Sequence, residues 1–415
     1  MTNDYHAIKR CRLSGDSNLI SVLNLGEQAL TGVFPPTVST SVSRGPLELV
    51  WSPTSQLLQL AHSFNPAEMY GDGYGYQSGL NAAMVEHLTS KALRLERMIS
   101  LASGDVVLDI GSSDATLLKA YRTQGLTRIG IDPSAAKFRE HYTDGVHLIP
   151  DFFSRDVFLH HFPSHRPRLV TSIAMFYDLE DPVGFAQQIA DILPDGGVWH
   201  FEQSYMPTML RQNSYDTICH EHIEYYSLIP VLKILELARL KAVEVLMNST
   251  NGGSFSVTAV KGNSQVGRDS KMIDWMLSEE ERLGLNSTAP FQAFSDRVFQ
   301  HRDSLRRLIA SLRSDNKRVL GYGASTKGNV ILQFCGFGPD DIEAIVDVNP
   351  KKFGCVTPGS HIPIISESEG RSREPDYYLV LPWHFRDFIL RKEAGYLANG
   401  GRMIFPMPEI EIVTA

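Results

Sequence analysis

Two stretches of the chain alternate short apolar runs with helical segments. Alternation of this kind is typical of a parallel sheet with helices on both faces. The predicted fold class is therefore α/β, with two tandem Rossmann-like, doubly wound sheets. The apolar runs are residues 106–110, 128–131, 169–173 and 197–201 in the first stretch, and 317–323, 342–347, 376–381 and 402–405 in the second.

The first 65 residues or so lack this alternation. Short strand-like pieces at 47–51 and 57–60 lie there among Gly, Pro and Ser, which predicts a small β-rich module. A helix is expected at 81–99, and a polar helical region at 271–314 is expected to link the two α/β units. The predicted domains are 1–68 (β-rich module), 69–265 (first α/β unit) and 266–415 (linker helices and second α/β unit).

Composition and charge argue against several classes of protein. The chain has 415 residues, of which 43% are hydrophobic, and a formal net charge of -8. Nucleic-acid binding needs a basic surface, and crossing a bilayer needs ~20 consecutive apolar residues, so we expect neither a nucleic-acid partner nor a membrane span. The N-terminus lacks a basic segment followed by an apolar run, and the four cysteines are scattered. We expect a cytoplasmic protein that is a monomer or a weak homodimer.

The turn after the first predicted strand of the first α/β unit indicates the cofactor. It has one glycine, Gly111, where a dinucleotide site would have three. S-adenosylmethionine has no pyrophosphate and does not need that close approach of the backbone. Asp109, at the strand end, suits its charged methionine end. Asp132 comes 23 residues later and can accept hydrogen bonds from ribose hydroxyls, while Asp151 and Phe152 are expected to flank the adenine.

These aspartates have an alternative explanation, because acidic residues at strand ends often cap helices. The interval between Asp109 and Asp132 favours the cofactor interpretation. Six further residues complete the predicted cofactor site, namely Tyr70, Ser78, Gly111, Ser112, Pro133 and Ala174.

The densest group of titratable residues is His220-Glu221-His222, followed by Tyr225 and Tyr226. A metal site is one interpretation, but the spacing differs from the His-Glu-x-x-His of a zinc helix. A polar network in the core is a second. A general base is the third, since an imidazole titrates near neutral pH and can remove a proton next to a carbonyl.

Five motifs in the same order make the chain resemble the sugar C-methyltransferases, which act on nucleotide-linked 4-keto-deoxyhexoses in antibiotic and surface-polysaccharide pathways. The resemblance covers nearly the whole chain. It implies three parts: a zinc-type N-terminal module, a methyltransferase domain and a C-terminal domain that helps to hold the sugar nucleotide. The motifs are LGEQALTGVFP (25–35), YGYQSGLN (74–81), DIGSSDATLL (109–118), YDTICHEH (215–222) and GYGASTKGN (321–329).

The resemblance also implies roles for particular residues. His222 would be the base, Glu221 its neighbour in the site, and Tyr76 a residue near the reacting sugar, with Tyr74 as the alternative. We include His220 in the catalytic group. Tyr225 is expected to contact the substrate.

Three departures from the family pattern bear on these roles. Where the family has two Cys-x-x-Cys pairs, this chain has Cys11, Ser14, Ser52 and Ser55. Because neutral serine is a poor zinc ligand, we predict that zinc is absent. In addition, Cys219 stands where the family has a tyrosine, and Asp178 where it has an active-site histidine. Both positions are expected to contact the substrate.

The second α/β unit carries a possible phosphate cradle. Gly323 follows a strand, and Lys327 stands at the start of a helix, an arrangement that suits a pyrophosphate. The spacing is not that of a Walker motif. A dinucleotide site and a purely structural repeat are the alternatives. The residues expected to meet the substrate here are Gly323, Lys327, Asn329, Asp347 and His384, while the neighbouring Trp383 could equally be packed in the core.

The sequence therefore predicts an S-adenosylmethionine-dependent C-methyltransferase that acts on a nucleotide-linked 4-keto-deoxy sugar through an enolate. Two alternatives remain open. One is O- or N-methylation of another small metabolite, because Asp178 and Cys219 alter the pocket. The other is a non-catalytic protein that binds a nucleotide sugar.

Overall fold

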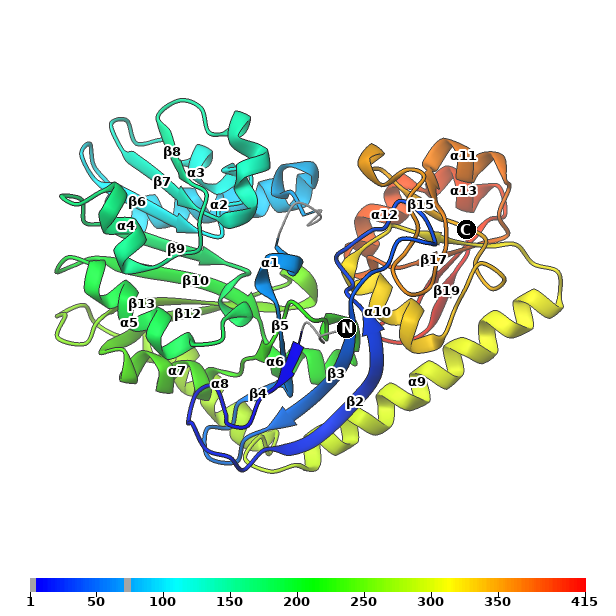
Figure 1. Cartoon of the computed structure of the whole chain (residues 1–415), viewed down its shortest axis with the longest axis horizontal. Helices are drawn as coiled ribbons and strands as arrows, with labels where there is room; N and C mark the ends of the chain where they lie inside the picture. The colour runs from blue at the N-terminus through cyan, green and yellow to red at the C-terminus, as the bar shows by residue number, and fades with distance from the viewer. Residues whose placement is uncertain (1–4, 71–75) are drawn as a thin grey trace.

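The computed structural model describes residues 5–70 and 76–415. They form two α/β units with a small antiparallel sheet between them (Figure 1). The predicted fold class is confirmed: both units contain a mostly parallel sheet, of seven and six strands, and the N-terminal part is antiparallel. None of the helices in the described ranges is long and apolar enough to cross a membrane.

The N-terminal module contains a four-stranded sheet in the order β11-β4-β3-β2 and a separate hairpin-like pair, β1-β5. Strand β11 comes from the chain immediately after His222, and it pairs with β4 through Glu224 and Tyr225. The module thus anchors the segment that carries His222. The elements are β1 (Tyr5–Ala7), β2 (Ile20–Ala29), β3 (Arg44–Trp51), β4 (Leu58–Leu60), β5 (His62–Phe64), α1 (Pro66–Met69), η1 (Ser78–Leu80) and β11 (Glu224–Tyr225).

The sheet of the first α/β unit has the order β12-β13-β10-β9-β6-β7-β8, with β13 antiparallel to its two neighbours. From β6 the chain adds strands first on one side (β7, β8) and then on the other (β9, β10), so the strand order reverses between β6 and β9. Ligands bind at the carboxyl ends of the strands at such a point. Its strands are β6 (Val106–Ile110), β7 (Thr127–Ile131), β8 (Val146–Ile149), β9 (Leu169–Ile173), β10 (Val198–Ser204), β12 (Leu240–Asn248) and β13 (Ser254–Lys261).

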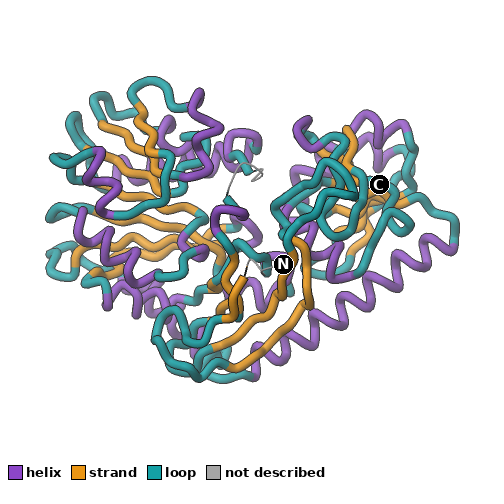
Figure 2. Tube along the Cα trace, viewed as in Figure 1, coloured by secondary structure: helices purple, strands orange, loops and turns teal. Residues whose placement is uncertain are grey.

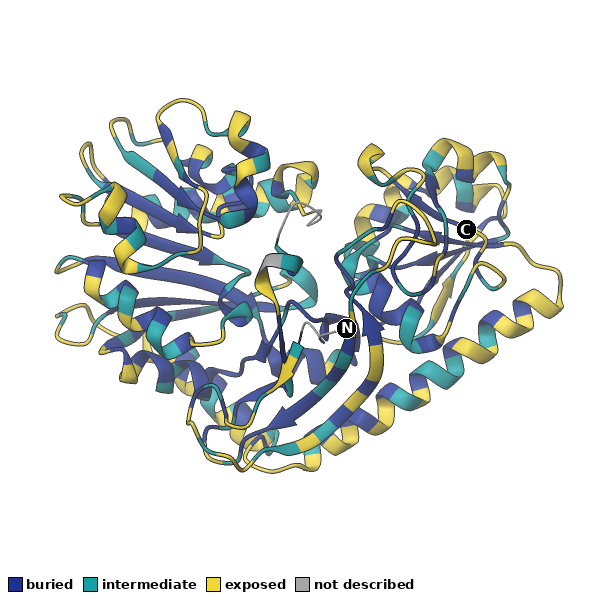
Figure 3. Cartoon of the chain, viewed as in Figure 1, coloured by how far each residue is buried: buried dark blue, intermediate teal, exposed yellow. Residues whose placement is uncertain are grey.

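Helices flank this sheet, and the central strand β6 is buried along its whole length, as expected for a parallel strand covered on both faces (Figure 3). Asn81 caps the first long helix, α2, by accepting hydrogen bonds from the amides of Ala83 and Met84. The helices are α2 (Ala82–Met98), α3 (Thr116–Ala120), η2 (Pro133–His141), α4 (Arg155–His161), η3 (Phe176–Asp178), α5 (Pro182–Ile192), α6 (Met206–Gln212), η4 (Tyr215–Thr217), α7 (Leu228–Leu237) and η5 (Thr250–Gly252).

The second α/β unit has the strand order β16-β15-β14-β17-β18-β19, parallel except for the edge strand β19. Ser325 caps α10 by accepting a hydrogen bond from the amide of Gly328 (3.0 Å). The elements are β14 (Val319–Tyr322), α10 (Thr326–Cys335), β15 (Ile345–Asp347), η6 (Pro350–Lys352), β16 (Ile364–Ser366), α11 (Glu367–Ser372), β17 (Tyr377–Val380), η7 (Trp383–Phe385), α12 (Arg386–Lys392), α13 (Ala394–Ala398), β18 (Arg402–Phe405) and β19 (Glu411–Val413).

The predicted helical linker consists of two helices, α8 (Ser270–Arg282) and α9 (Ala289–Ser314). Figure 2 shows α9 as a long helix that runs beside the N-terminal sheet towards the second unit. Its buried residues Phe294, Val298 and Leu305 recur at helical spacing, so one face packs on the protein and the other is exposed. Helix α9 therefore braces the second α/β unit against the N-terminal module. The domain boundaries after residues 68 and 265 remain predictions.

Candidate active site

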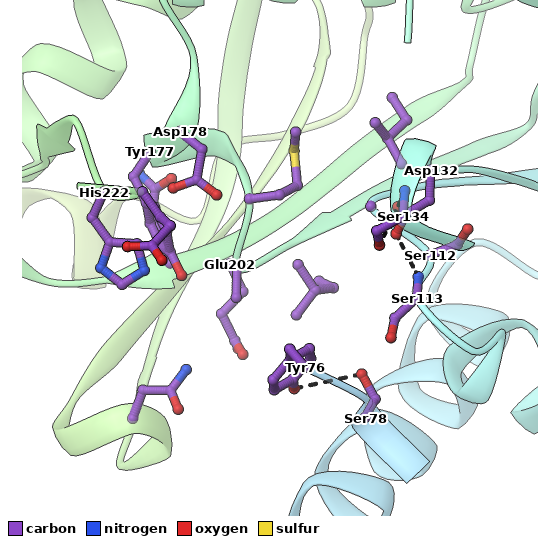
Figure 4. Close-up of a pocket in the computed structure, with 18 of the residues that line it drawn as sticks. Tyr76, Ser78, Ser112, Ser113, Asp132, Ser134, Tyr177, Asp178, Glu202 and His222 are labelled. Carbon is purple, nitrogen blue, oxygen red and sulfur yellow. Dashed lines mark hydrogen bonds between the residues drawn. The ribbon is translucent and has the colours of Figure 1, made fainter. Parts of the chain in front are cut away.

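A cavity of about 560 Å³ lies at the carboxyl edge of the seven-stranded sheet. Its wall combines the turns after β6 and β9, the segment around His222, and the start of α10 from the second unit. Figure 4 shows Asp132 and the turn after β6 at one end of the cavity, His222 and Asp178 at the other, and Glu202 between them. The cavity thus has a cofactor end, next to the switch point, and a histidine end.

The turn after β6 is held in shape by Asp132. This carboxylate accepts hydrogen bonds from the amide of Ser113 (2.7 Å) and from the amide and hydroxyl of Ser134 (both 2.7 Å). The amide of Gly111 donates to the carbonyl of Ile131 (2.9 Å), and its φ of +76° lies in the region that favours glycine. Asp132 lines the cavity as well, so it both shapes the turn and faces the predicted ribose position.

Asp109 is a buried carboxyl group at the end of β6. Burial and the nearby charge of Asp132 raise its pKa to about 7, although the hydroxyl of Thr171 donates a hydrogen bond to it (2.6 Å). A cation placed next to this carboxyl group would favour its ionised form. The site therefore fits the positively charged methionine end of S-adenosylmethionine.

Most of the other predicted cofactor residues also line the cavity, and one does not. Asp151 is exposed outside the wall, where its carboxylate accepts a hydrogen bond from the amide of Phe152 (2.7 Å). Tyr76 lines the cavity beside Ser78, whose hydroxyl contacts the Tyr76 hydroxyl at 3.5 Å (Figure 4). The cavity-lining members of the predicted cofactor set are Tyr70, Ser78, Asp109, Gly111, Ser112, Asp132, Pro133, Phe152 and Ala174.

His222 has the orientation of a base. Its Nδ1 lies 3.0 Å from the carbonyl oxygen of Thr217, and because a carbonyl can only accept, Nδ1 carries the proton. Nε2 is then the unprotonated nitrogen. The ring lines the cavity and meets Tyr177 edge-on, with the ring centroids 4.4 Å apart. Burial and the charge of Lys327 lower the pKa of His222 to about 4, so the imidazole is neutral at pH 7.

His220 does not line the cavity, and its place in the catalytic group stays a prediction. It is fully buried, its Nε2 bonds the carbonyl of Gly45 (3.2 Å), and its ring packs edge-on against Phe64. Successive side chains of an extended segment point to opposite faces, but here a turn at His220-Glu221 places Glu221 and His222 together on the cavity. His220 belongs to the interior of the N-terminal module.

Cys219 and Tyr225 lie behind the cavity wall instead of in it. Cys219 is fully buried in the hydrophobic core, and burial raises the pKa of its thiol well above the usual range. Tyr225 lines a separate cavity of about 20 Å³ on another side of His222. Their contact with the substrate stays a prediction, because in this structure they lie behind the histidine segment.

Two carboxyl groups stand at the histidine end. Asp178 and Glu221 both line the cavity, and burial raises the pKa of each. Glu221 is also tied to its surroundings, because the hydroxyl of Thr31 donates to its Oε2 (3.4 Å) and the hydroxyl of Tyr70 donates to its backbone carbonyl (3.3 Å). Tyr74, the alternative to Tyr76, lies outside the described residues.

The second α/β unit contributes two of its five predicted residues, Lys327 and His384. Nζ of Lys327 donates to the carbonyl of Asn251 in the first unit (3.1 Å), so the lysine spans the two units. Nδ1 of His384 is buried and has no hydrogen-bond partner among the described residues. Trp383 is packed in the core, and its indole N–H donates to Asp216 (2.7 Å).

Gly323, Asn329 and Asp347 do not line the cavity, and their substrate contacts stay predictions. The side-chain amide of Asn329 donates to the carbonyl of Thr31 (2.7 Å), which joins the second unit to the N-terminal module. Asp347 accepts from the amides of Ala324 and Asn349 (both 2.7 Å), and Nζ of Lys352 lies 4.0 Å away. A lysine of the same chain therefore lies beside the carboxylate that is expected to meet the substrate.

Glu202 is a cavity residue that the sequence analysis missed. It lies at the carboxyl end of β10, where it pairs with His87 (2.6 Å), Lys91 (2.7 Å) and Asn248 (2.7 Å). Although burial opposes ionisation, these partners lower its pKa to about 2. Glu202 comes one residue after the predicted strand 197–201, and this position is the signal that could have identified it in the sequence.

Comparison with known proteins establishes the family. The sequence matches the models of a zinc binding domain (residues 11–70), a methyltransferase domain (84–245) and a C-methyltransferase C-terminal domain (249–408). It is 30% identical to the C-methyltransferase NovU of Streptomyces niveus over 411 residues, which cover 98% of this chain and 97% of NovU. The chain belongs to this C-methyltransferase family. It is an S-adenosylmethionine-dependent methyltransferase, as predicted.

Solved structures show weaker likeness. An S-adenosylmethionine-dependent methyltransferase from Clostridium acetobutylicum aligns at 10% identity with a TM-score of 0.33, over 43% of this chain and 92% of that one. The CcbJ methyltransferase of Streptomyces caelestis aligns at 12% identity with a TM-score of 0.32, over 42% and 89%. At TM-scores this low, neither structure adds to the assignment.

The residues at the family's zinc positions do not fit a metal. Sγ of Cys11 lies 3.1 Å from Oγ of Ser55 and accepts a hydrogen bond from the side-chain amide of Gln59 (3.2 Å). The backbone amide of Ser55 donates to Oγ of Ser52 (3.4 Å). Within the described ranges, no group of three or more His, Cys, Asp or Glu side chains could hold a metal ion. Hydrogen bonds around Cys11 take the place that thiolate–zinc bonds have in a structural site.

We predict that the purified protein carries no stoichiometric zinc and that a chelator leaves its melting temperature unchanged. Conversely, the triple variant S14C/S52C/S55C restores four thiols and is expected to bind about one zinc ion per chain. Elemental mass spectrometry measures both. The same triple change combined with Cys11→Ser has only three thiols and serves as the control. One zinc per wild-type chain would contradict the prediction.

Proposed function

We propose that this enzyme methylates a carbon atom of a nucleotide-linked 4-keto-deoxy sugar, through an enolate that His222 forms. The observation that carries the proposal is the position of His222, which holds an unprotonated Nε2 in the same cavity as the turn predicted to bind the cofactor. A base with its lone pair in this cavity suits proton removal from carbon, which must precede transfer of a methyl group to that carbon.

The proton transfer follows from the state of the imidazole. Nε2 of His222 takes the proton next to the ketone, the C–H electron pair forms the C=C bond, and the carbonyl π pair moves to oxygen. The carbonyl of Thr217 then holds the Nδ1–H of the imidazolium. S-adenosylmethionine, when bound, supplies an electrophilic methyl group on a sulfonium. Asp109 and Asp132 would hold its methionine and ribose parts.

The position of the Lys327 ammonium group is an argument for a nucleotide-linked substrate. It lies at the N-terminus of α10, where free amides and the helix dipole favour an anion. Burial lowers the pKa of Lys327, and the charge of Asp216 opposes this effect. Next to it, His384 offers an unpartnered Nδ1. A pyrophosphate would pair with both side chains, which places the sugar towards His222.

Lys327→Met is expected to raise the KM for the nucleotide sugar about 10- to 100-fold with little change in kcat, because a charged hydrogen bond contributes about 1.5–3 kcal/mol to binding. Steady-state kinetics measures this split. Lys352→Met is the matched control, since Lys352 lies in the same unit outside the cavity. A kcat loss in Lys327→Met at unchanged KM would refute the anchoring role.

The test of the proposed function is methyl transfer to a panel of nucleoside-diphosphate 4-keto-6-deoxyhexoses, with the product examined by NMR. A new C–CH₃ group at the carbon next to the ketone supports it. A methyl group on oxygen or nitrogen would favour the O- or N-methyltransferase alternative. Tight binding of a sugar nucleotide without turnover across the panel would favour a non-catalytic binding protein.

A further inference from the structure

Asp178 and His222 both line the cavity, at its histidine end. Asp178 is the last residue of η3, directly after β9, and η3 is joined to the histidine segment by a hydrogen bond from the amide of Ile223 to the carbonyl of Tyr177 (3.1 Å). The Tyr177 ring contacts the His222 ring. Figure 4 shows Asp178 and His222 at the same end of the pocket.

The carboxyl group of Asp178 is incompletely satisfied. Within the part of the chain that the structure describes, its Oδ1 is shielded from solvent and has no hydrogen-bond partner. A buried polar atom without a partner is costly, and one in a cavity wall is typically satisfied by a ligand. The neighbouring Glu221 differs, because its carboxyl group already contacts Thr31.

The surroundings of Asp178 favour its protonated form. Burial raises its pKa well above the usual range, the charges of Glu221 and Glu224 add to this, and a side-chain hydrogen bond with Tyr70 opposes it. The titratable groups that face it are Tyr70, Cys219, Glu221, Glu224 and Tyr225. This shift favours the protonated carboxylic acid, the form of the side chain that can donate a hydrogen bond.

We propose that the carboxyl group of Asp178 donates a hydrogen bond to the ketone oxygen of the substrate and stabilises the enolate oxygen as His222 removes the neighbouring proton. The inference rests on the proposed function. The C–H electron pair becomes the C=C bond, the carbonyl π pair moves to oxygen, and the proton passes to Nε2. The negative charge that develops on oxygen meets the O–H of Asp178, which remains on Asp178 as a hydrogen-bond donor.

The geometry favours Asp178 over Tyr76 for this task. Tyr76 lies beside Ser78, across the cavity from His222 in Figure 4, and its side chain is 46% exposed. The ketone oxygen is two bonds from the carbon that loses the proton, so its donor must lie at the same end of the cavity as the base. Asp178 lies at that end, whereas Tyr76 lies beside Ser78.

The experiment follows hydrogen exchange at the carbon next to the ketone, by NMR in D₂O, on a nucleoside-diphosphate 4-keto-6-deoxyhexose without any methyl donor. Asp178→Ala is expected to slow exchange about 100-fold, the typical effect of removing one oxyanion donor. Asp178→Asn keeps an N–H donor and is expected to stay within about 10-fold of wild type. Wild-type exchange should fall as pH rises through the pKa of Asp178, and Asp178→Asn should lack this alkaline loss.

Asp156→Asn, an exposed change on α4, is the matched control and should exchange at the wild-type rate. Exchange by Asp178→Ala at the wild-type rate would overturn the inference while leaving the proposed function intact. The same holds if folded Asp178→Asn shows the wild-type alkaline loss. No exchange by the wild-type enzyme with any keto sugar of the panel would overturn the proposed function and the role of Asp178 with it.

Discussion

His222→Ala is expected to lower the rate of methyl transfer about 10²- to 10⁴-fold, the usual contribution of a positioned general base. The variant lacks the one imidazole whose unprotonated nitrogen lies in the cavity wall at the histidine end. Proton removal itself is affected, so exchange of the carbon-bound proton with solvent should fall by the same factor. Single-turnover kinetics and NMR in D₂O measure the two rates.

The neighbouring histidine provides the control. His220→Gln keeps a donor for the carbonyl of Gly45 and changes a residue that lies inside the N-terminal module. It should lower the melting temperature and leave the exchange rate within a few-fold of wild type. Full exchange by His222→Ala would remove His222 as the base.

The pH dependence of wild-type activity follows from the same residue. Because the pKa of His222 is lowered to about 4, the base is neutral above this pH and becomes protonated as pH falls through it. We therefore expect kcat/KM to stay level from neutral pH down to about pH 5. With a base of ordinary pKa, kcat/KM would already have fallen by half near pH 6.5.

The parallel cores were predictable because their strands are continuous apolar runs. The runs at 106–110 and 169–173 are β6 and β9 with the predicted bounds. Residues at the carboxyl ends of such strands meet at one edge, which is why Asp109 and Asp132 were found. Glu202 obeys the same rule and was missed only because the predicted strand stopped one residue short of it.

Contacts between distant segments were not predictable in this way. Nothing in the local pattern indicates that β11 pairs with β4, or that Asn329 bonds Thr31. His220 and His222 look equivalent in the sequence, yet a turn sends one into the module and the other to the cavity. Such outcomes depend on tertiary packing, which a single sequence does not encode locally.

The sequence also made two aspartates look alike, and the structure separates them. In both α/β units a glycine turn follows the first strand. An aspartate at the carboxyl end of the next strand accepts a hydrogen bond from a backbone amide of that turn. Asp132 accepts from Ser113 and Asp347 from Ala324, each at 2.7 Å. Only Asp132 lines the cavity, whereas Asp347 has Lys352 beside it. The second unit therefore has the same contact between turn and aspartate as the first, but its aspartate does not line the cavity.

Asp132→Ala and Asp347→Ala therefore form a matched pair. Each change leaves two backbone amides without their acceptor, at a cost of about 1–3 kcal/mol per buried donor, so both should lower the melting temperature to a similar extent. Only Asp132→Ala is expected to weaken binding of S-adenosylhomocysteine, about 100-fold, because it loses both the shape of the turn and a charged acceptor for the ribose.

Isothermal titration calorimetry with S-adenosylhomocysteine measures the affinities, and thermal melts measure the stabilities. If Asp347→Ala weakens S-adenosylhomocysteine binding as strongly as Asp132→Ala does, loss of affinity reflects general loosening of the fold, and the ribose role of Asp132 fails. If Asp132→Ala keeps wild-type affinity while its stability falls, Asp132 is only a structural cap. A selective loss of affinity at equal destabilisation assigns cofactor binding to the first unit alone and leaves the second unit to the substrate.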